Sequence, residues 1–102
     1  MVKQSNQLKP LIDKFVLGLR ERGIRVNRII LYGSYAQGRA NSGSDIDIAV
    51  ISSSFDRKNL LQRQEILGEV IYPLAEPIEA VGYSDREFKN RTPLSFLSGI
   101  LS

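Results

Sequence analysis

The chain has 102 residues, of which 42% are hydrophobic and 25% are charged, and it carries a formal net charge of +3. This length and composition predict a single globular domain, residues 1–102, built around one hydrophobic core. Cysteine and histidine are absent from the sequence. Their absence excludes disulfides, thiolate chemistry, Ser-His triads and imidazole metal sites. Any metal would bind oxygen ligands, which favours Mg²⁺ or Mn²⁺.

The mildly basic balance suits an anionic ligand such as a nucleotide, and equally suits an ordinary surface with a small excess of Lys and Arg. The sequence has no dense basic run interleaved with aromatic residues, so we expect no direct binding of nucleic acid. It also has no apolar run of about 18 residues and no signal sequence at its start. We therefore expect a cytoplasmic protein that does not enter the membrane.

The first segment predicts a helix that ends at Gly23. Its apolar residues form one stripe at helical spacing. These are Leu8, Leu11, Ile12, Phe15, Val16 and Leu19. Pro10 interrupts the pattern and predicts either a kink or a later start near Leu11.

The next elements are a strand over residues 25–32, rich in β-branched and apolar side chains, and a turn at Gly33. A short helix is expected from Ser34, followed by a loop over residues 38–44 that is rich in Gly, Asn and Ser. Residues 45–51 predict a second strand.

In the second half, Asp56 is the expected N-cap of a helix that runs to about Tyr72. A third strand follows over residues 77–83. The Ser84–Glu87 capping box predicts a short helix over residues 85–90, and residues 94–101 suggest one more helix. Helices alternating with strands indicate the α/β class, with a small mixed sheet of three strands, or four, flanked by helices.

Asp45 and Asp47 are the first candidates for a functional site, because residues two apart on a strand point to the same face. Two such carboxylates repel each other unless a cation lies between them. A pair of Mg²⁺ ions held by such carboxylates stabilises both oxygens of an in-line displacement. Solvated residues at the start of a strand are the alternative interpretation.

Gly33 and Ser34 form the second part of the pattern, at the end of the preceding strand. Glycine lets the backbone approach a phosphate closely, and the N–H groups that open a helix favour an anion. A Gly-Ser turn alone is common. Coupled to Asp45-x-Asp47 on a neighbouring strand, it favours a nucleotide site.

Glu79 is an isolated carboxylate in an otherwise apolar strand, where burial is costly unless the charge is paired or bound to a metal. It could complete the metal ligands or accept a proton from an attacking hydroxyl. An edge-strand glutamate facing water is the alternative. On the loop, Arg39 could hold a phosphate oxygen and Ser44 could contact phosphate, although each could also be a plain loop residue.

Gly33-Ser34, ten residues, and then Asp45-x-Asp47 resembles the signature of the DNA polymerase β-like nucleotidyltransferase superfamily, in its minimal nucleotidyltransferase branch. The resemblance implies that fold, and transfer of a nucleoside monophosphate from a triphosphate, usually ATP, to an acceptor hydroxyl with two Mg²⁺ ions. It assigns the phosphates to Gly33 and Ser34, both metals to Asp45 and Asp47, and one metal and the nucleophile to Glu79. The family usually has Asp where this chain has the longer Glu79.

The resemblance also implies a partner, because minimal nucleotidyltransferases are commonly paired with HEPN-type proteins as toxin–antitoxin couples. In such couples the nucleotidyltransferase is the antitoxin and adenylylates a tyrosine of the HEPN ribonuclease. Two alternatives stay open. One is a catalytically weak module that binds a nucleotide or a partner, and the other is a nucleotidyltransferase that acts on a small molecule or an RNA end. The sequence does not specify the nucleotide base.

Overall fold

The computed structural model describes residues 5–41 and 43–91. The helix expected over residues 94–101 lies outside the described residues. In chain order the elements are α1 (Ser5–Glu21), β1 (Arg28–Tyr32), α2 (Gly33–Ala36), β2 (Ile46–Ile51), the 3₁₀ turn η1 (Ser53–Arg57), α3 (Leu60–Ile71), the 3₁₀ turn η2 (Tyr72–Leu74), β3 (Ile78–Tyr83) and α4 (Asp85–Arg91). Within this part of the chain, none of the helices combines the length and apolar character that crossing a membrane requires.

The strands form one mixed sheet in the order β1-β2-β3, which confirms the expected α/β class. β1 and β2 are antiparallel, whereas β2 and β3 are parallel. A parallel pair needs a crossover connection, and α3 supplies most of it. The central strand β2 therefore carries one set of side chains to each face of the sheet.

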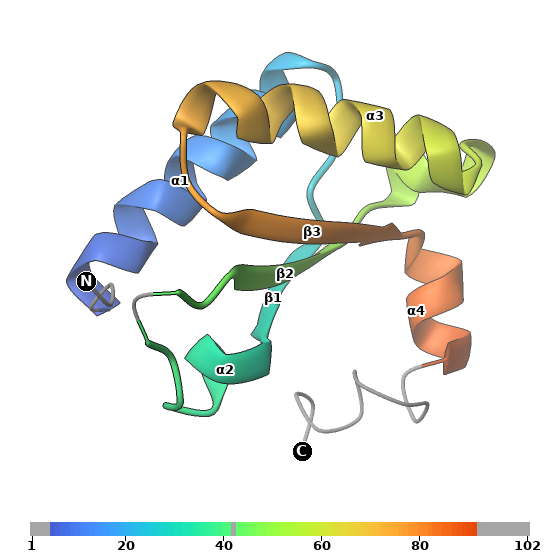
Figure 1. Cartoon of the computed structure of the whole chain (residues 1–102). Helices are drawn as coiled ribbons and strands as arrows, with labels where there is room; N and C mark the ends of the chain where they lie inside the picture. The colour runs from blue at the N-terminus through green and yellow to red at the C-terminus, as the bar shows by residue number, and fades with distance from the viewer. Residues whose placement is uncertain (1–4, 42, 92–102) are drawn as a thin grey trace.

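α1 and α3 lie together on one face of the sheet (Figure 1). The core on that face combines side chains of β2 and β3 with the apolar stripes of the two helices. Its buried members are Leu11, Phe15, Leu19, Ile24, Ile46, Ile48, Val50, Phe55, Leu67, Val70, Ile78 and Ala80. A smaller cluster on the opposite face consists of Ile30, Ala49, Ile51 and Phe88, the last from α4. Asp47 shares this second face, which has the lighter cover.

α1 extends back to Ser5 and includes Pro10, so the alternative start near Leu11 is wrong. Pro10 removes one N–H from the helix ladder, near its N-terminal end. Tertiary packing outweighs that loss, because Phe15 and Leu19 on the same stripe are completely buried.

β1 begins at Arg28, three residues later than expected. Asn27 N still donates to Ile51 O of β2 at 2.9 Å, but other groups of residues 25–27 bond to the segment that follows β2. Arg25 N donates to Ser54 Oγ at 2.9 Å, and Ser53 N donates to Asn27 Oδ1 at 2.8 Å. β-propensity alone does not reveal this competition from side-chain acceptors.

The N-cap of α3 is Asn59, and the expectation of Asp56 is wrong. Asn59 Oδ1 accepts from Gln62 N at 2.8 Å, and Gln62 Oε1 accepts from Asn59 N at 2.9 Å. This reciprocal capping box satisfies two backbone donors at once, whereas Asp56 lies within η1.

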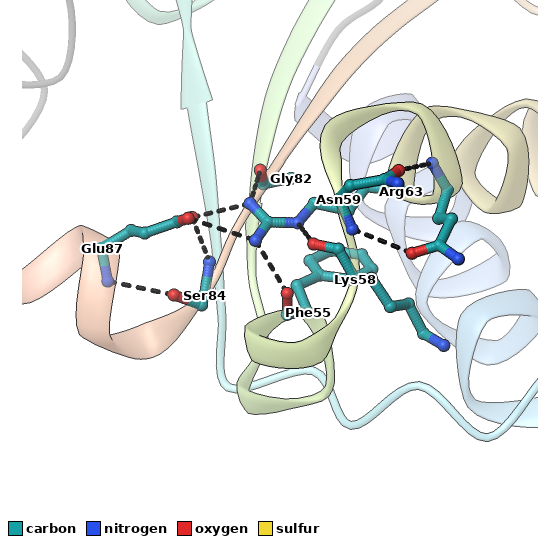
Figure 2. Close-up of polar contacts among 8 residues, drawn as sticks. Phe55, Lys58, Asn59, Arg63, Gly82, Ser84 and Glu87 are labelled. Atoms are coloured by element: carbon teal, nitrogen blue, oxygen red, sulfur yellow. Dashed lines mark hydrogen bonds and ion pairs between the residues drawn. The ribbon is translucent and has the colours of Figure 1, made fainter.

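Arg63 is a buried cation on α3, only 7% exposed, that ties the elements at one end of the sheet together (Figure 2). Its Nε donates to Lys58 O at 2.9 Å and its Nη2 donates to Phe55 O at 2.7 Å. Its Nη1 donates to Gly82 O at 3.2 Å. The guanidinium thereby satisfies backbone carbonyls of η1, β3 and the loop before α3.

Glu87 of α4 completes this network, since its carboxylate accepts from Arg63 Nη1 at 2.6 Å and from Nη2 at 3.1 Å. The same carboxylate accepts from Ser84 N at 2.9 Å, and Ser84 Oγ accepts from Glu87 N at 3.1 Å. The predicted Ser84–Glu87 capping box is therefore confirmed. Its glutamate also carries the charge that balances Arg63.

Replacing Arg63 should destabilise the protein strongly, because three carbonyls and a partly buried carboxylate lose their donor. We expect Arg63→Met to lower the free energy of unfolding by about 3 kcal/mol or more, measured by urea denaturation. The matched control is Arg86→Met, which removes an exposed guanidinium 3.6 Å from Asp56. It should cost less than about 1 kcal/mol. Equal losses in the two variants would contradict the anchoring role of Arg63.

Candidate active site

Tyr32, Asp47 and Glu79 form one row across the sheet. Tyr32 of β1 is the register partner of Asp47 of β2, and Asp47 is the register partner of Glu79 of β3. Register partners point to the same face, and neighbouring strands are about 4.8 Å apart. The two carboxylates therefore lie side by side on the face opposite α1 and α3. We call these three residues the carboxylate row.

Asp45 lies just before β2, which begins one residue later than expected, at Ile46. Asp45 is exposed and Asp47 is half-buried. Burial, and secondly the negative charge of Asp45, raise the pKa of Asp47 above its usual value. The two aspartates therefore interact electrostatically.

Glu79 is exposed, as the alternative of an edge-strand glutamate facing water predicts, and the expected burial in its strand is wrong. β3 is an edge strand of the described sheet, and the smaller apolar cluster lies further along the same face. The argument from burial cost therefore does not apply to Glu79. Its candidacy depends instead on the register, which places it next to Asp47.

Gly33 brings the two parts of the sequence motif together. Its φ is +73°, a conformation that favours glycine, and a Cβ added to it would lie 2.2 Å from Asp47 Oδ2 and 3.0 Å from Asp47 Cγ. No side chain fits in that space. The Asp47 carboxylate therefore packs directly against the backbone of the turn that begins α2.

α2 is a single turn in which Gln37 N donates to Gly33 O at 3.1 Å. Tyr32 is its N-cap, and the Tyr32 side chain does not cap it. The first N–H groups of any helix have no partner within that helix. Those of α2 belong to the turn on which Asp47 rests, where an anion could accept from them.

The loop after α2 holds the two weaker candidates, Arg39 and Ser44. The backbone N of Arg39 donates to Ser34 O at 2.8 Å, and its side chain is exposed. Ser44 Oγ accepts from Asn41 N at 2.9 Å, and Ser44 N donates to Asn41 O at 3.0 Å. Ser44 thus closes the loop, which is a structural role, and contacts of either residue with a nucleotide stay a prediction.

The acidic residues here fit a divalent cation by their chemistry, because carboxylate oxygens are the ligands that Mg²⁺ prefers. Among the described residues, no group of three or more acidic side chains is gathered closely enough to hold a metal. Like charges repel, so these carboxylates would turn toward one another only around a cation. Asp47 is in register with Glu79, and the charge of Asp45 acts on Asp47, so these three carboxylates are the candidates for such a turn.

Tyr32 is the member of the row that the sequence did not single out. Burial, then the charge of Asp47, then Tyr83 and Glu79, raise its pKa above the ordinary value. Its phenol therefore interacts electrostatically with both carboxylates. No sequence signal shows this, because it depends on which residue of β2 faces Tyr32 in the antiparallel register.

Adding a methyl group at Gly33 should move Asp47 as well as strain the turn. Gly33→Ala should cost about 2–4 kcal/mol, with about 1–2 kcal/mol from the left-handed backbone alone. The control is Gly38→Ala, where φ is +70° and a Cβ would meet nothing within 4 Å. It isolates the backbone strain. If urea denaturation shows the same loss of unfolding free energy for both variants, the close contact between Gly33 and Asp47 adds nothing to the backbone strain, which would contradict this account.

Because the pKa of Asp47 is raised, the ionised Asp47 carboxylate should destabilise the folded protein. Asp47 favours the folded state only when it is protonated. This stabilisation is therefore present below its unfolded pKa of about 3.9 and is lost as pH rises through the folded pKa. Asp47→Asn should therefore raise the free energy of unfolding at pH 7, by no more than about 1 kcal/mol because the group is half-exposed.

The gain from Asp47→Asn should disappear as the pH of the denaturation series falls below about 4. Asp13→Asn is the control, since that exposed carboxylate pairs with Lys9 at 3.3 Å and should give no gain. A variant at Asp47 that is less stable than wild type at pH 7 would contradict the electrostatic account.

Residues 12–94 match the model of the nucleotidyltransferase domain family. A Methanocaldococcus jannaschii protein, MJ1305, whose name proposes protein adenylyltransferase activity, is 27% identical over 99 residues, covering 93% of this chain and 67% of its own length. The fold is similar to a Sulfolobus solfataricus crystal structure named for nucleotidyltransferase activity, with a TM-score of 0.57 and 19% identity over 88% of this chain and 84% of that one.

The structure is also similar to a chain in a crystal structure of a toxin–antitoxin with AMP-PNP. The TM-score is 0.51 and the identity 30%, over 69% of this chain and 55% of that one. The sequence resemblance to minimal nucleotidyltransferases is thereby confirmed. The family model covers most of the described fold, including the turn, both aspartates and Glu79, and this chain belongs to the nucleotidyltransferase domain family.

Proposed function

We propose that this nucleotidyltransferase transfers AMP from ATP to a hydroxyl group of a protein partner, with Mg²⁺. The observation that carries the proposal is the close approach of the Asp47 carboxylate to the backbone of Gly33, together with the register of Asp47 with Glu79. It brings the turn proposed to bind phosphate next to the carboxylates proposed to bind metal. The relative named for protein adenylyltransferase activity and the similarity to a toxin–antitoxin structure with AMP-PNP support the acceptor and nucleotide classes.

In this proposal the turn binds the triphosphate. Gly33 lets the backbone approach the β- and γ-phosphates, and the N–H groups of the first turn of α2 donate to their oxygens, with the Ser34 hydroxyl as a further donor. The Arg39 side chain is exposed on the adjoining loop and would contribute a charge-assisted hydrogen bond. Ser44 would keep that loop in place.

Asp45, Asp47 and Glu79 would hold the metal ions. Bound Mg²⁺ would neutralise charge that develops on the attacking and leaving oxygens. The acceptor oxygen forms a bond to the α-phosphorus as the bond to pyrophosphate breaks, and the acceptor proton passes to the Glu79 carboxylate. The exposure of Glu79 leaves it accessible to an acceptor that arrives on a second protein.

The partner that we propose is a HEPN-type ribonuclease, with this chain as its antitoxin and a tyrosine as the acceptor. The similarity to the toxin–antitoxin structure supports this assignment. The phenol of a tyrosine has a lower pKa than an aliphatic hydroxyl and loses its proton to a carboxylate more readily. An exposed catalytic face is the arrangement that a macromolecular acceptor requires.

The transfer is tested by incubating the protein with ATP labelled at the α-phosphate, Mg²⁺ and the protein encoded by its neighbouring gene. Asp45→Ala and Asp47→Ala should each lower labelling of the partner by at least about 100-fold, because each removes a metal ligand. Asp13→Ala, remote on α1, should leave labelling unchanged. Glu79→Gln should lower labelling while leaving the complex with the partner intact.

Three outcomes would contradict parts of the proposal. A stable complex without label, unaffected by Asp45→Ala, would identify a binding module that performs no transfer. Label on an aminoglycoside or an RNA 3′ end, with no protein partner present, would identify another acceptor class. Equal labelling with EDTA present would contradict the metal requirement.

A further inference from the structure

A groove of about 280 Å³ lies between α1 and the segment where α3 passes into η2. One wall is a single face of α1, and the other is formed by the end of α3 and by η2. The lining residues are Lys14, Leu17, Gly18, Glu21, Arg22, Val70, Pro73 and Leu74. α1 and α3 cover the sheet face opposite the carboxylate row, so the groove is separate from the candidate site (Figure 1).

The apolar part of this groove is open to water, because Leu17 of α1 is 57% exposed. Gly18 beside it lets α1 lie directly against α3, since a Cβ there would be 2.7 Å from Cγ1 of Val70. The packing of the two helices therefore shapes the groove. A second apolar surface that covered Leu17 would be stabilised by removing this side chain from water.

Lys14 and Glu21 place opposite charges at the two ends of the α1 wall. They are seven residues apart, about 10 Å along the helix, so they cannot pair with each other. Neither forms an ion pair within the described part of the chain, whereas Arg22 on the same groove pairs with Glu69 at 3.5 Å. Leu17 is thus flanked by one unpaired cation and one unpaired anion.

This wall of the groove is complementary to itself. The midpoint between Lys14 and Glu21 falls between Leu17 and Gly18. When α1 of a second copy packs antiparallel across a two-fold axis at this midpoint, Lys14 of each copy faces Glu21 of the other. Leu17 of the two copies then meets at the centre. A parallel arrangement would bring like charges together, so the charges select the antiparallel one.

We propose that this groove is a homodimer interface, which α1 of a second copy of this chain covers in antiparallel orientation. The same patch then serves both subunits, as a two-fold contact requires. The carboxylate row stays uncovered in each subunit, because it lies on the other face of the sheet. The inference does not depend on the proposed function.

The test is charge reversal, followed by sedimentation equilibrium from micromolar to millimolar concentration. Wild type should show a monomer–dimer equilibrium. Lys14→Glu and Glu21→Lys should each weaken dimerisation by about 10-fold or more, because each change sets like charges together at both ends of the contact. An equimolar mixture of the two variants should dimerise again, since opposite charges then face each other between unlike subunits. A role of these residues in folding alone would not produce that recovery.

The matched control is Arg20→Glu, which reverses an exposed charge of α1 that does not line the groove. It should dimerise as wild type does, and urea denaturation verifies that each variant is folded. A wild type that stays monomeric at millimolar concentration would overturn the inference. A dimer that survives both charge reversals would also overturn it, because the contact would then lie elsewhere.

A third contradicting result would come from the protein encoded by the neighbouring gene. If wild type is monomeric and Leu17→Asp abolishes binding of that protein, the groove belongs to the partner and the homodimer is wrong. Label transfer from ATP does not enter the test of dimerisation. Its failure would overturn the proposed function and leave this inference standing.

Discussion

The Asp47 carboxylate lies so close to the backbone of Gly33 that no side chain could stand at that position. This approach requires two features at once. The turn must adopt a positive φ, which Gly33 does at +73°, and β2 must pair with β1 in the register that puts Asp47 opposite Tyr32. Because a shift of one residue would turn Asp47 to the other face, the site depends on the register of the sheet.

The helices set that register from the opposite face. Ile46, Ile48 and Val50 of β2 are completely buried beneath α1 and α3. Their burial holds Asp47 on the side with the lighter cover, because alternate residues of a strand point to opposite faces. Figure 1 shows this division, with α1 and α3 on one side of the sheet and α2 and α4 away from them. At the far end of the strands, Arg63 and Glu87 anchor α3 to α4 (Figure 2).

Much of this arrangement could be predicted from the sequence, because its signals are local. The apolar stripe of α1, the Ser84–Glu87 capping box and the strand–turn–strand order around Gly33 each lie within a short stretch of chain. Asn59 and Gln62 also form a local signal, and their capping box is the one that begins α3, ahead of the candidate Asp56. The start of β1 could not be read in this way, because it depends on acceptors more than twenty residues away, such as Ser54 Oγ.

The candidate site also combines features that local sequence predicts with features that depend on contacts between distant parts of the chain. The spacing of Gly33 and Asp47 predicted that they meet, whereas their contact at the backbone is visible only in three dimensions. The exposure of Glu79 depends on β3 being an edge strand, and the place of Tyr32 depends on an antiparallel register. Neither property is encoded in composition or periodicity.

The most direct test of the central claim is to locate a bound metal–triphosphate by nuclear magnetic resonance. Titration with Mn²⁺ and AMP-PNP should broaden the backbone amide signals closest to the paramagnetic ion. The account predicts that broadening begins at Gly33, Ser34 and Asp47, then reaches Glu79, and spares the α3 residues around Leu67. Uniform broadening, or broadening centred on α3 or α4, would contradict the claim that the Gly33 turn and Asp47 form one site.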